Sequence, residues 1–334
     1  MIHRNLSCYF YAMQLNGVIP PICTPFEESG EVDYDALRQN IARYIRAGVR
    51  SFVVLGSTGE APLLSIDEKQ QLLQVAREAA GDSQLIAGTG VESVKETVAL
   101  IHRAAVLNYD AALVLTPHYY RSQMSRPESQ LGYYRAVADS SPIPVLIYNF
   151  PQMTGIDLLL ETVLQLSEHP NIVGIKESAP DLGRIEKLTS SLPIGFDVLV
   201  GASSKFHESL CLGAKGGIVA IANAAPSPTL QIYHCYQSGD VAGSREAQRK
   251  IVDAANVAAR FGIQGLKYAM DLMGYFGGQS RLPLLPLSAE HKTEIELLFS
   301  NLKEDDQDAP GKEVPVRILQ VQTRKSRSRL PQLS

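Results

Sequence analysis

The stretch NIVGIKES, at residues 171–178, decides how the rest of the sequence is interpreted. Its residues from Ile172 to Ile175 are apolar or glycine, which is typical of a strand buried on both faces in a parallel sheet covered by helices. Lys176 ends that run. Burial disfavours the charged ammonium form of a lysine and favours the neutral amine, which attacks carbonyl carbons. The alternative is a lysine that merely reaches solvent where its strand ends, so the rest of the chain must decide.

Short apolar runs alternate with longer amphipathic segments along most of the chain, and the amphipathic segments have apolar residues at helical spacing. Three Ser-x-x-Glu patterns stand where such helices should begin, as capping boxes do. They are Ser65/Glu68, Ser93/Glu96 and Ser125/Glu128. The predicted strands are residues 17–22, 52–55, 85–87, 111–115, 145–148, 171–176, 197–201 and 216–220. Eight such units predict an α/β fold, a TIM (β/α)8 barrel, rather than an open doubly wound sheet.

The repeat also sets the predicted domain organisation. We expect an N-terminal extension at residues 1–16, the barrel at 17–238 and a C-terminal helical appendix at 239–302. Residues 303–334 are charged and punctuated by proline and glycine, which predicts a disordered tail. No GxGxxG fingerprint follows the first predicted strand, and this argues against a dinucleotide-binding fold.

Composition disfavours several classes of partner and site. The 334 residues carry a formal net charge of −4, so no basic field favours nucleic acid, and no apolar run is long enough for a membrane span. Four scattered cysteines predict free thiols in a reducing compartment. His207 and Cys211 are interpreted as one face of a helix rather than as a metal site. Arg4 and Ser7 precede the first acidic residue, Glu27, which is compatible with a transit peptide, whereas secretion is disfavoured.

The residues that follow the predicted strands form one rim, because the active site of a TIM barrel lies at the carboxyl ends of its strands. Expected there are Thr24, GSTGE at 56–60, TPHYY at 116–120, YNFPQMTG at 148–155, Lys176, Gly201 and Ile218. They bring together hydroxyls, glycines and one lysine without an acidic cluster for a metal. This combination favours metal-free imine chemistry on a small 2-oxo acid.

Two parts of that rim have a predicted task. Gly56 and Gly59 let their turn bend tightly, so that backbone N–H groups and the hydroxyls of Ser57 and Thr58 can face a carboxylate. Tyr148, on the strand before that of the lysine, can pass protons to and from a substrate oxygen. Taken alone, each motif has a plainer interpretation, a simple turn or a packing tyrosine.

GSTGE, TPHYY, YNFPQMTG and GIKES, in this order and spacing, resemble the motifs of the dihydrodipicolinate synthase / N-acetylneuraminate lyase superfamily of Schiff-base aldolases. The resemblance covers about residues 17–302 and implies a homotetramer, a dimer of dimers, that needs no cofactor and no metal. It implies that Lys176 forms an imine with pyruvate and that Tyr148 shuttles protons. Its further implied site residues are Ser57 and Thr58 at the pyruvate carboxylate, Gly201 and Ile218 around pyruvate, and Tyr119 in a hydroxyl relay across a subunit interface.

One position departs from the synthases of this superfamily. Met153 stands where they have an arginine that holds the carboxylate of aspartate semialdehyde, and a thioether cannot bind a carboxylate. Residues 116–125, 169–178 and 260–278 look closer to the eukaryotic 4-hydroxy-2-oxoglutarate aldolases, which release pyruvate and glyoxylate. Those enzymes have asparagine where this chain has Thr58. Since glyoxylate also carries a carboxylate, backbone N–H groups or Asn149 are the candidate donors for it.

The lead prediction is therefore a pyruvate-forming class I aldolase that cleaves 4-hydroxy-2-oxoglutarate. A 2-keto-3-deoxy-sugar-acid aldolase and a dihydrodipicolinate synthase, which Met153 disfavours, are alternatives with the same imine. A non-catalytic 2-oxo-acid-binding protein is an alternative of another class, but binding alone needs neither Lys176 nor Tyr148. We expect a soluble intracellular protein, mitochondrial by the resemblance, with the cytoplasm as the alternative.

Overall fold

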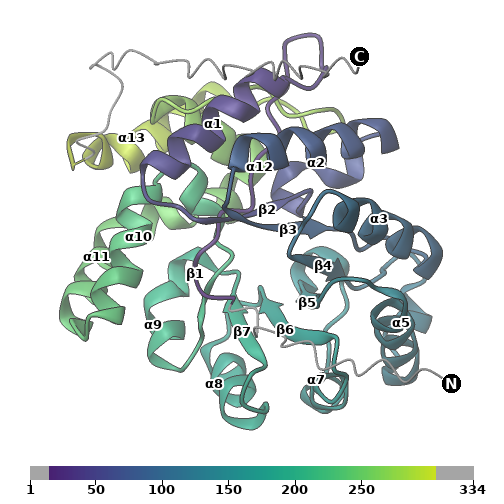
Figure 1. The fold of residues 1–334 in the computed structure, drawn as a ribbon. Helices are drawn as coiled ribbons and strands as arrows, with labels where there is room; N and C mark the ends of the chain where they lie inside the picture. The colour runs from purple at the N-terminus through teal and green to yellow at the C-terminus, as the bar shows by residue number, and fades with distance from the viewer. Residues whose placement is uncertain (1–14, 306–334) are drawn as a thin grey trace, which may run out of the picture.

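A computed structural model describes residues 15–305, and Figure 1 shows a central group of strands surrounded by helices. The eight strands are parallel and pair in the order β1-β8-β7-β6-β5-β4-β3-β2. Their bounds are β1 (Gly17–Val18), β2 (Ser51–Val54), β3 (Gln84–Gly88), β4 (Ala111–Leu115), β5 (Val145–Asn149), β6 (Ile172–Glu177), β7 (Asp197–Val200) and β8 (Gly216–Gly217).

The sheet closes on itself between β1 and β2. Just beyond β1, Pro21 forms a parallel bridge with Val53 of β2, and the N–H of Ile22 donates to the Val53 carbonyl at 2.8 Å. The predicted TIM barrel is therefore confirmed. The first predicted strand, 17–22, is shorter than expected because Pro20 and Pro21 have no N–H for a ladder. The last, 216–220, stops early because a 3-10 helix (Ala220–Asn223) follows.

Helices alternate with the strands and cover the outside of the barrel (Figure 1). Those of more than one turn are α1 (Tyr34–Arg46), α2 (Ile66–Ala80), α3 (Val94–Val106), α5 (Pro127–Ser140), α7 (Leu160–Ser167), α8 (Leu182–Ser191), α9 (Phe206–Cys211) and α10 (Pro226–Gln237). Two single-turn helices, α4 (Arg121–Met124) and α6 (Pro151–Thr154), lie in the loops after β4 and β5. No helix among residues 15–305 is long and apolar enough to cross a membrane.

Of the three predicted capping boxes, the first forms in full. The N–H of Ser65 donates to the Glu68 carboxylate at 2.7 Å, and the N–H of Glu68 donates to the Ser65 hydroxyl at 3.2 Å. At α3 only half of the box forms, because the Ser93 hydroxyl accepts the Glu96 N–H but no return bond exists.

The third predicted box, Ser125 with Glu128, is wrong. Ser125 is the residue at which α4 ends, and its hydroxyl donates to the Arg121 carbonyl at 2.9 Å. Helix α5 begins at Pro127 instead, because proline lacks an N–H and suits the first helical position.

Within the described part of the chain, three helices follow the barrel: α11 (Val241–Ala255), α12 (Val257–Leu272) and α13 (Ala289–Asp305). Helices α11 and α12 meet at Asn256, and α12 runs on through a kink at Gly262, whose φ of 72° suits glycine. The predicted C-terminal helical appendix is thus present, whereas the predicted extension at 1–16 and tail at 303–334 lie mostly outside the described residues.

The core has two layers that follow from strand alternation. Side chains such as Val53, Leu113 and Leu199 fill the barrel interior. Their strand neighbours, such as Phe52 and Val114, face the helices and form the larger outer layer. Because adjacent residues of a strand point to opposite faces, each strand end presents one side chain inward and the next outward.

Candidate active site

Lys176 and Tyr148 lie side by side at the carboxyl ends of β6 and β5. They are partners in the parallel register, and the Lys176 Nζ lies 4.0 Å from the centroid of the Tyr148 ring. Each residue is only 4% exposed. No described residue forms an ion pair with Lys176, so its amine is open to a substrate carbonyl. The predicted lysine and tyrosine are therefore close enough to act on one small molecule.

Apolar side chains pack around this pair. The ring of Phe150 stacks on that of Tyr148, with 5.7 Å between the centroids. Ile218, predicted to line the pyruvate site, is 1% exposed and belongs to the same interior cluster as Tyr148 and Leu199. Apolar surroundings strengthen the electrostatic interactions of the polar groups among them.

The turn predicted to bind a carboxylate follows β2. Ser57, Thr58 and Gly59 form a 3-10 helix, η1 (Ser57–Gly59), in which Thr58 and Gly59 are buried and Ser57 is half-buried. A Cβ on Gly59 would lie 2.9 Å from the Ile22 carbonyl oxygen, so a side chain there would push the turn away from β1. The Thr24 hydroxyl donates to the Gly59 carbonyl at 2.7 Å. The predicted role of Gly59 in a tight turn thus has a concrete cause, the close approach of two backbones.

The positive φ angles of this turn are not on its glycines, contrary to what its composition suggests. Gly56 has a φ of −75°, whereas Leu55 and Glu60, the residues that flank the GSTG segment, have φ of 63° and 55°. Non-glycine residues rarely adopt this left-handed conformation, and when they do they tend to lie at functional sites.

A polar clamp lies behind the Lys176–Tyr148 pair, on the outer face of the same two strands. It consists of Asn149, Glu177 and Arg184. The Asn149 amide donates to the Glu177 carboxylate at 2.8 Å, and Arg184 Nε donates to the same carboxylate at 2.6 Å. Burial raises the pKa of Glu177, although Arg184 and the hydrogen bonds oppose that rise. The clamp therefore ties the end of β5 to the end of β6.

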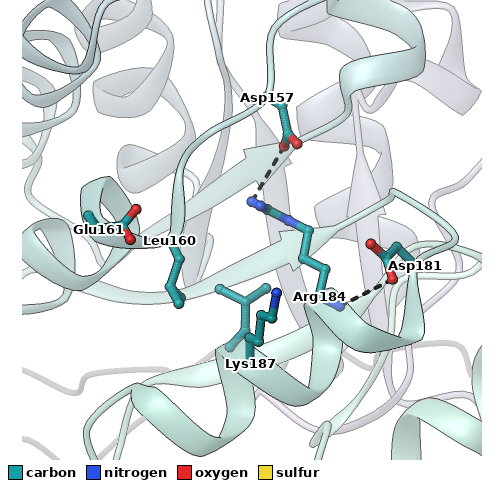
Figure 2. A pocket seen from close by; sticks show the side chains of 7 residues that line it. Asp157, Leu160, Glu161, Asp181, Arg184 and Lys187 are labelled. Carbon is teal, nitrogen blue, oxygen red and sulfur yellow. Dashed lines mark hydrogen bonds and ion pairs between the residues drawn. The ribbon is translucent and has the colours of Figure 1, made fainter.

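Arg184 reaches the clamp from helix α8. Figure 2 shows its guanidinium directed toward Asp157, from which it is 3.5 Å away, in a groove between α7 and α8. Its Nη2 also donates to the Leu158 carbonyl at 2.6 Å. The groove thus lies on the outer side of the barrel wall, while the lysine and tyrosine lie on the inner side.

Asn149 does not fit its proposed role as donor to a second substrate carboxylate. Its side chain is fully buried, its amide donates to both Asp157 and Glu177, and its oxygen accepts the Leu158 N–H at 3.2 Å. That hypothesis is wrong because strand alternation turns residue 149 outward when Tyr148 faces inward.

The loop after β4 carries Tyr119 outside the barrel interior. Tyr119 is 78% exposed, and its ring meets that of Tyr120 edge to face, with 5.2 Å between the centroids. Its N–H and that of His118 donate to the Glu92 carboxylate, which fixes the loop. Within one described chain, the Tyr119 ring is therefore not buried against Lys176 and Tyr148.

Gly201 and Met153 occupy the remaining part of the predicted rim. A Cβ on Gly201 would collide with the Ser178 side chain, so this glycine leaves room for a hydroxyl two residues beyond Lys176. Sequence reasoning assigned Ser178 no role, although alternation puts residues 176 and 178 on one face. Met153 lies on α6 and is 61% exposed, and its thioether offers no hydrogen-bond donor.

Arg121 is a further residue that sequence reasoning left without a role. A Cβ on Gly155 would lie 2.8 Å from the Arg121 Cζ, so the guanidinium packs over the residue that ends α6, the helix of Met153. Within residues 15–305, no hydrogen-bond or ion-pair partner of this guanidinium is present. Its five N–H donors are free for an anion.

Metal ligation is not offered by the described residues. No group of three or more histidine, cysteine, aspartate or glutamate side chains within residues 15–305 could hold a metal ion. His207 and Cys211 lie one turn apart on α9, and His207 packs against α11, since its Nδ1 lies 2.8 Å from the Ser244 hydroxyl, whereas Cys211 is exposed.

Comparisons with known proteins agree with this geometry. A 4-hydroxy-tetrahydrodipicolinate synthase of Xanthomonas campestris is 37% identical over 294 residues, which cover 86% of this chain and 95% of that protein. The crystal structure of dihydrodipicolinate synthase from Aquifex aeolicus superposes with a TM-score of 0.81 at 32% identity, covering 86% of this chain and 98% of that one.

A third relative was solved with a ligand. It is a prophage protein of the dihydrodipicolinic acid synthase family from E. coli K12 in complex with pyruvate, with a TM-score of 0.82 and 27% identity over 87% of this chain and 99% of that one. These relatives carry synthase names, so the closer likeness to eukaryotic 4-hydroxy-2-oxoglutarate aldolases stays a prediction. The sequence profile of the Dihydrodipicolinate synthetase family matches residues 14–302. The chain therefore belongs to this family of lyases, which work through a lysine imine and need no metal.

Proposed function

We propose that this protein is a pyruvate-forming class I aldolase whose imine is made by Lys176. The observation that carries the proposal is the buried contact between the Lys176 amine and the Tyr148 ring at the mouth of the barrel. The amine attacks the C2 carbonyl of a 4-hydroxy-2-oxo acid, and water leaves to give the imine. The imine then accepts the electron pair of the C3–C4 bond when that bond breaks.

Tyr148 serves the proton transfers of this sequence. As the C3–C4 bond breaks, its hydroxyl oxygen accepts the proton of the C4 hydroxyl and its own proton passes to C3 of the enamine on Lys176. Hydrolysis of the resulting imine releases pyruvate and regenerates the amine. The hydroxyls of Ser57 and Thr58 and the N–H groups of their turn hold the pyruvate carboxylate throughout.

For the aldehyde half, we propose glyoxylate, so that the substrate is 4-hydroxy-2-oxoglutarate. Met153 offers no charged donor, but the unpaired Arg121 guanidinium over Gly155 can supply one to a second carboxylate. This favours an aldehyde that carries a carboxylate over the neutral aldehyde of a sugar acid. Condensation of pyruvate with aspartate semialdehyde is the second candidate, because the relatives above are named synthases.

Reductive trapping tests the mechanism. Pyruvate with borohydride should inactivate the protein and leave a stable mass increment on Lys176, since reduction turns a labile imine into a secondary amine. Peptide mapping locates the adduct. An adduct on another lysine, or no adduct, contradicts the aldolase mechanism. The alternative would then be a protein with this fold that binds a 2-oxo acid without catalysis.

A substrate panel tests the finer proposal. We expect 4-hydroxy-2-oxoglutarate to give the highest kcat/KM for pyruvate release, ahead of 2-keto-3-deoxy sugar acids. Aspartate semialdehyde with pyruvate is the third arm of the panel. Efficient condensation there would show that our interpretation of Met153 is wrong and that the chain is a synthase.

We also propose a homotetramer in which Tyr119, exposed in the single chain, meets the active site of a neighbouring subunit. Sedimentation velocity measures the oligomeric state directly. We propose the mitochondrion as the compartment, because the eukaryotic aldolases that this chain resembles are mitochondrial. The cytoplasm is the alternative.

A further inference from the structure

The turn at residues 56–60 ends on a strained residue that is held by a buried ion pair. Glu60 has a φ of 55°, in the left-handed region that disfavours side chains. Its carboxylate is 1% exposed and lies 2.6 Å from the Nζ of Lys267, which is equally buried. A strained backbone conformation persists only where surrounding contacts stabilise it, and here the contacts are with the Glu60 side chain.

The groups that hold Glu60 come from the C-terminal helices rather than from the barrel. Lys267 lies on α12, and its ammonium also donates to the Gln279 carbonyl at 2.6 Å. The N–H of Arg281, in the segment that follows α12, donates to the other Glu60 oxygen at 2.9 Å. The predicted C-terminal appendix thus reaches the residue next to Gly59.

Arg281 connects the same segment to the start of α2. Its guanidinium makes two hydrogen bonds with the Glu68 carboxylate, at 2.6 and 2.8 Å, and holds the Glu68 pKa at about 2. Both cations also lie over the ring of Phe26, with the Lys267 Nζ and the Arg281 Cζ each 4.4 Å from its centroid. Both ends of the loop from Glu60 to α2 are therefore fastened to one C-terminal segment.

We infer that Lys267 is a positioning residue that, through Glu60, keeps the 56–60 turn in the conformation that binds the carboxylate of a 2-oxo acid. Arg281 supports it through the second Glu60 oxygen. The inference rests on the proposed function of that turn. It makes α12 part of the active-site scaffold, although Lys267 itself touches no substrate.

The geometry explains why a charged pair is needed at this position. Gly59 packs against the Ile22 carbonyl, so the turn approaches β1 closely and small movements change where its N–H groups point. A carboxylate held through both oxygens fixes the direction of the Glu60 side chain, and with it the left-handed backbone. An apolar contact would fill the space without fixing that direction.

The test compares Glu60→Gln and the double variant Glu60→Gln/Lys267→Met with the wild type. The double variant removes both buried charges at similar volume, and the single variant keeps an acceptor for the Arg281 N–H. Arg260→Met is the matched control, because Arg260 also lies on α12 and pairs with Glu294 at an exposed position. The readout is the rate of borohydride trapping on Lys176 as a function of pyruvate concentration.

We expect the half-saturating pyruvate concentration to rise by roughly 10-fold or more in both Glu60 variants, while the maximal trapping rate changes less than about 3-fold. Arg260→Met should behave as the wild type. A folded double variant with wild-type half-saturation overturns the inference, and so does a loss confined to melting temperature. If the double variant does not fold, Glu60→Gln alone decides by the same readout. Absence of any adduct in the wild type overturns the proposed function instead, and this inference with it.

Discussion

Arg184→Met should destabilise the fold in a way that depends on pH, because it leaves Glu177 as a buried carboxylate without its cation. Glu177 has no exposed surface, and Arg184 Nε is 2.6 Å from it. Removing one partner of a buried pair costs about 3–5 kcal/mol. Asn149 and the Ala179 N–H still donate to Glu177, so we expect the lower end of this range, about 3 kcal/mol near pH 8.

The sign of the pH dependence follows from the direction of the pKa shift. Burial already raises the pKa of Glu177 in the wild type, and loss of Arg184 removes the main opposing cause, so the pKa rises further. A carboxyl with a raised folded pKa favours folding in its protonated form. That contribution is complete below the ordinary glutamate pKa of ~4.3 and is lost as pH rises through the folded value. The free-energy difference between variant and wild type should therefore be small near pH 4 and grow with pH by at most about 1.4 kcal/mol per pH unit.

Urea denaturation followed by circular dichroism, at several pH values from 4 to 8, measures this difference. Glu177→Gln/Arg184→Met should remove the pH dependence, because no ionisable group remains in the pair. Arg249→Met breaks only the exposed pair with Glu246 and should leave the midpoint unchanged. A destabilisation below about 1 kcal/mol at pH 8, or one of equal size at every pH, would refute this reasoning.

Two further predictions concern the chemistry. Tyr148→Phe should lower kcat by ~10²–10⁴, the usual contribution of a positioned proton-transfer group, while pyruvate binding persists. A near-normal kcat would show that Tyr148 only packs against its neighbours. Arg121→Met should lower kcat/KM for 4-hydroxy-2-oxoglutarate by roughly 10–100-fold, the loss of one charge-assisted hydrogen bond, and leave a neutral sugar acid unaffected. Arg126→Met, which changes an exposed arginine nearby, is the control, and equal losses on both substrates would remove Arg121 from carboxylate recognition.

The barrel was predictable because its signals are local. Each strand is a short apolar run in the sequence, and each helix has apolar residues at a period near 3.6. Eight repeats of strand and helix are enough to recognise the fold. Lys176 was predictable for the same reason, since it interrupts an apolar run at a strand end. The error at Ser125 shows the limit of such signals: Ser-x-x-Glu matched the capping pattern, but Pro127 inside the motif determined where the helix begins.

The supports of the site were not predictable, because they are contacts between residues far apart in the chain. Nothing near Glu60 in sequence indicates that its partner is Lys267, and nothing near Lys267 indicates a partner in the turn after β2. Asn149 is the exception, because alternation along β5 turns it to the face opposite that of Tyr148 and its assignment as a donor left this out. Arg121 likewise became a candidate only when the structure placed it over Gly155.

Two buried ion pairs lie next to two parts of the candidate site, and their positions indicate that they serve function. Glu177 and Arg184 lie behind the lysine and tyrosine, and Glu60 and Lys267 lie behind the carboxylate turn. Replacing a buried pair with apolar residues of similar volume is often neutral or stabilising, so stability alone does not account for either pair. What an ion pair adds is direction, because its hydrogen bonds hold a side chain at one angle. An aldolase needs that direction at two places at once, since the imine carbon must meet the amine while the carboxylate stays in its turn. We therefore expect apolar replacement of either pair to reduce catalysis more than it reduces stability.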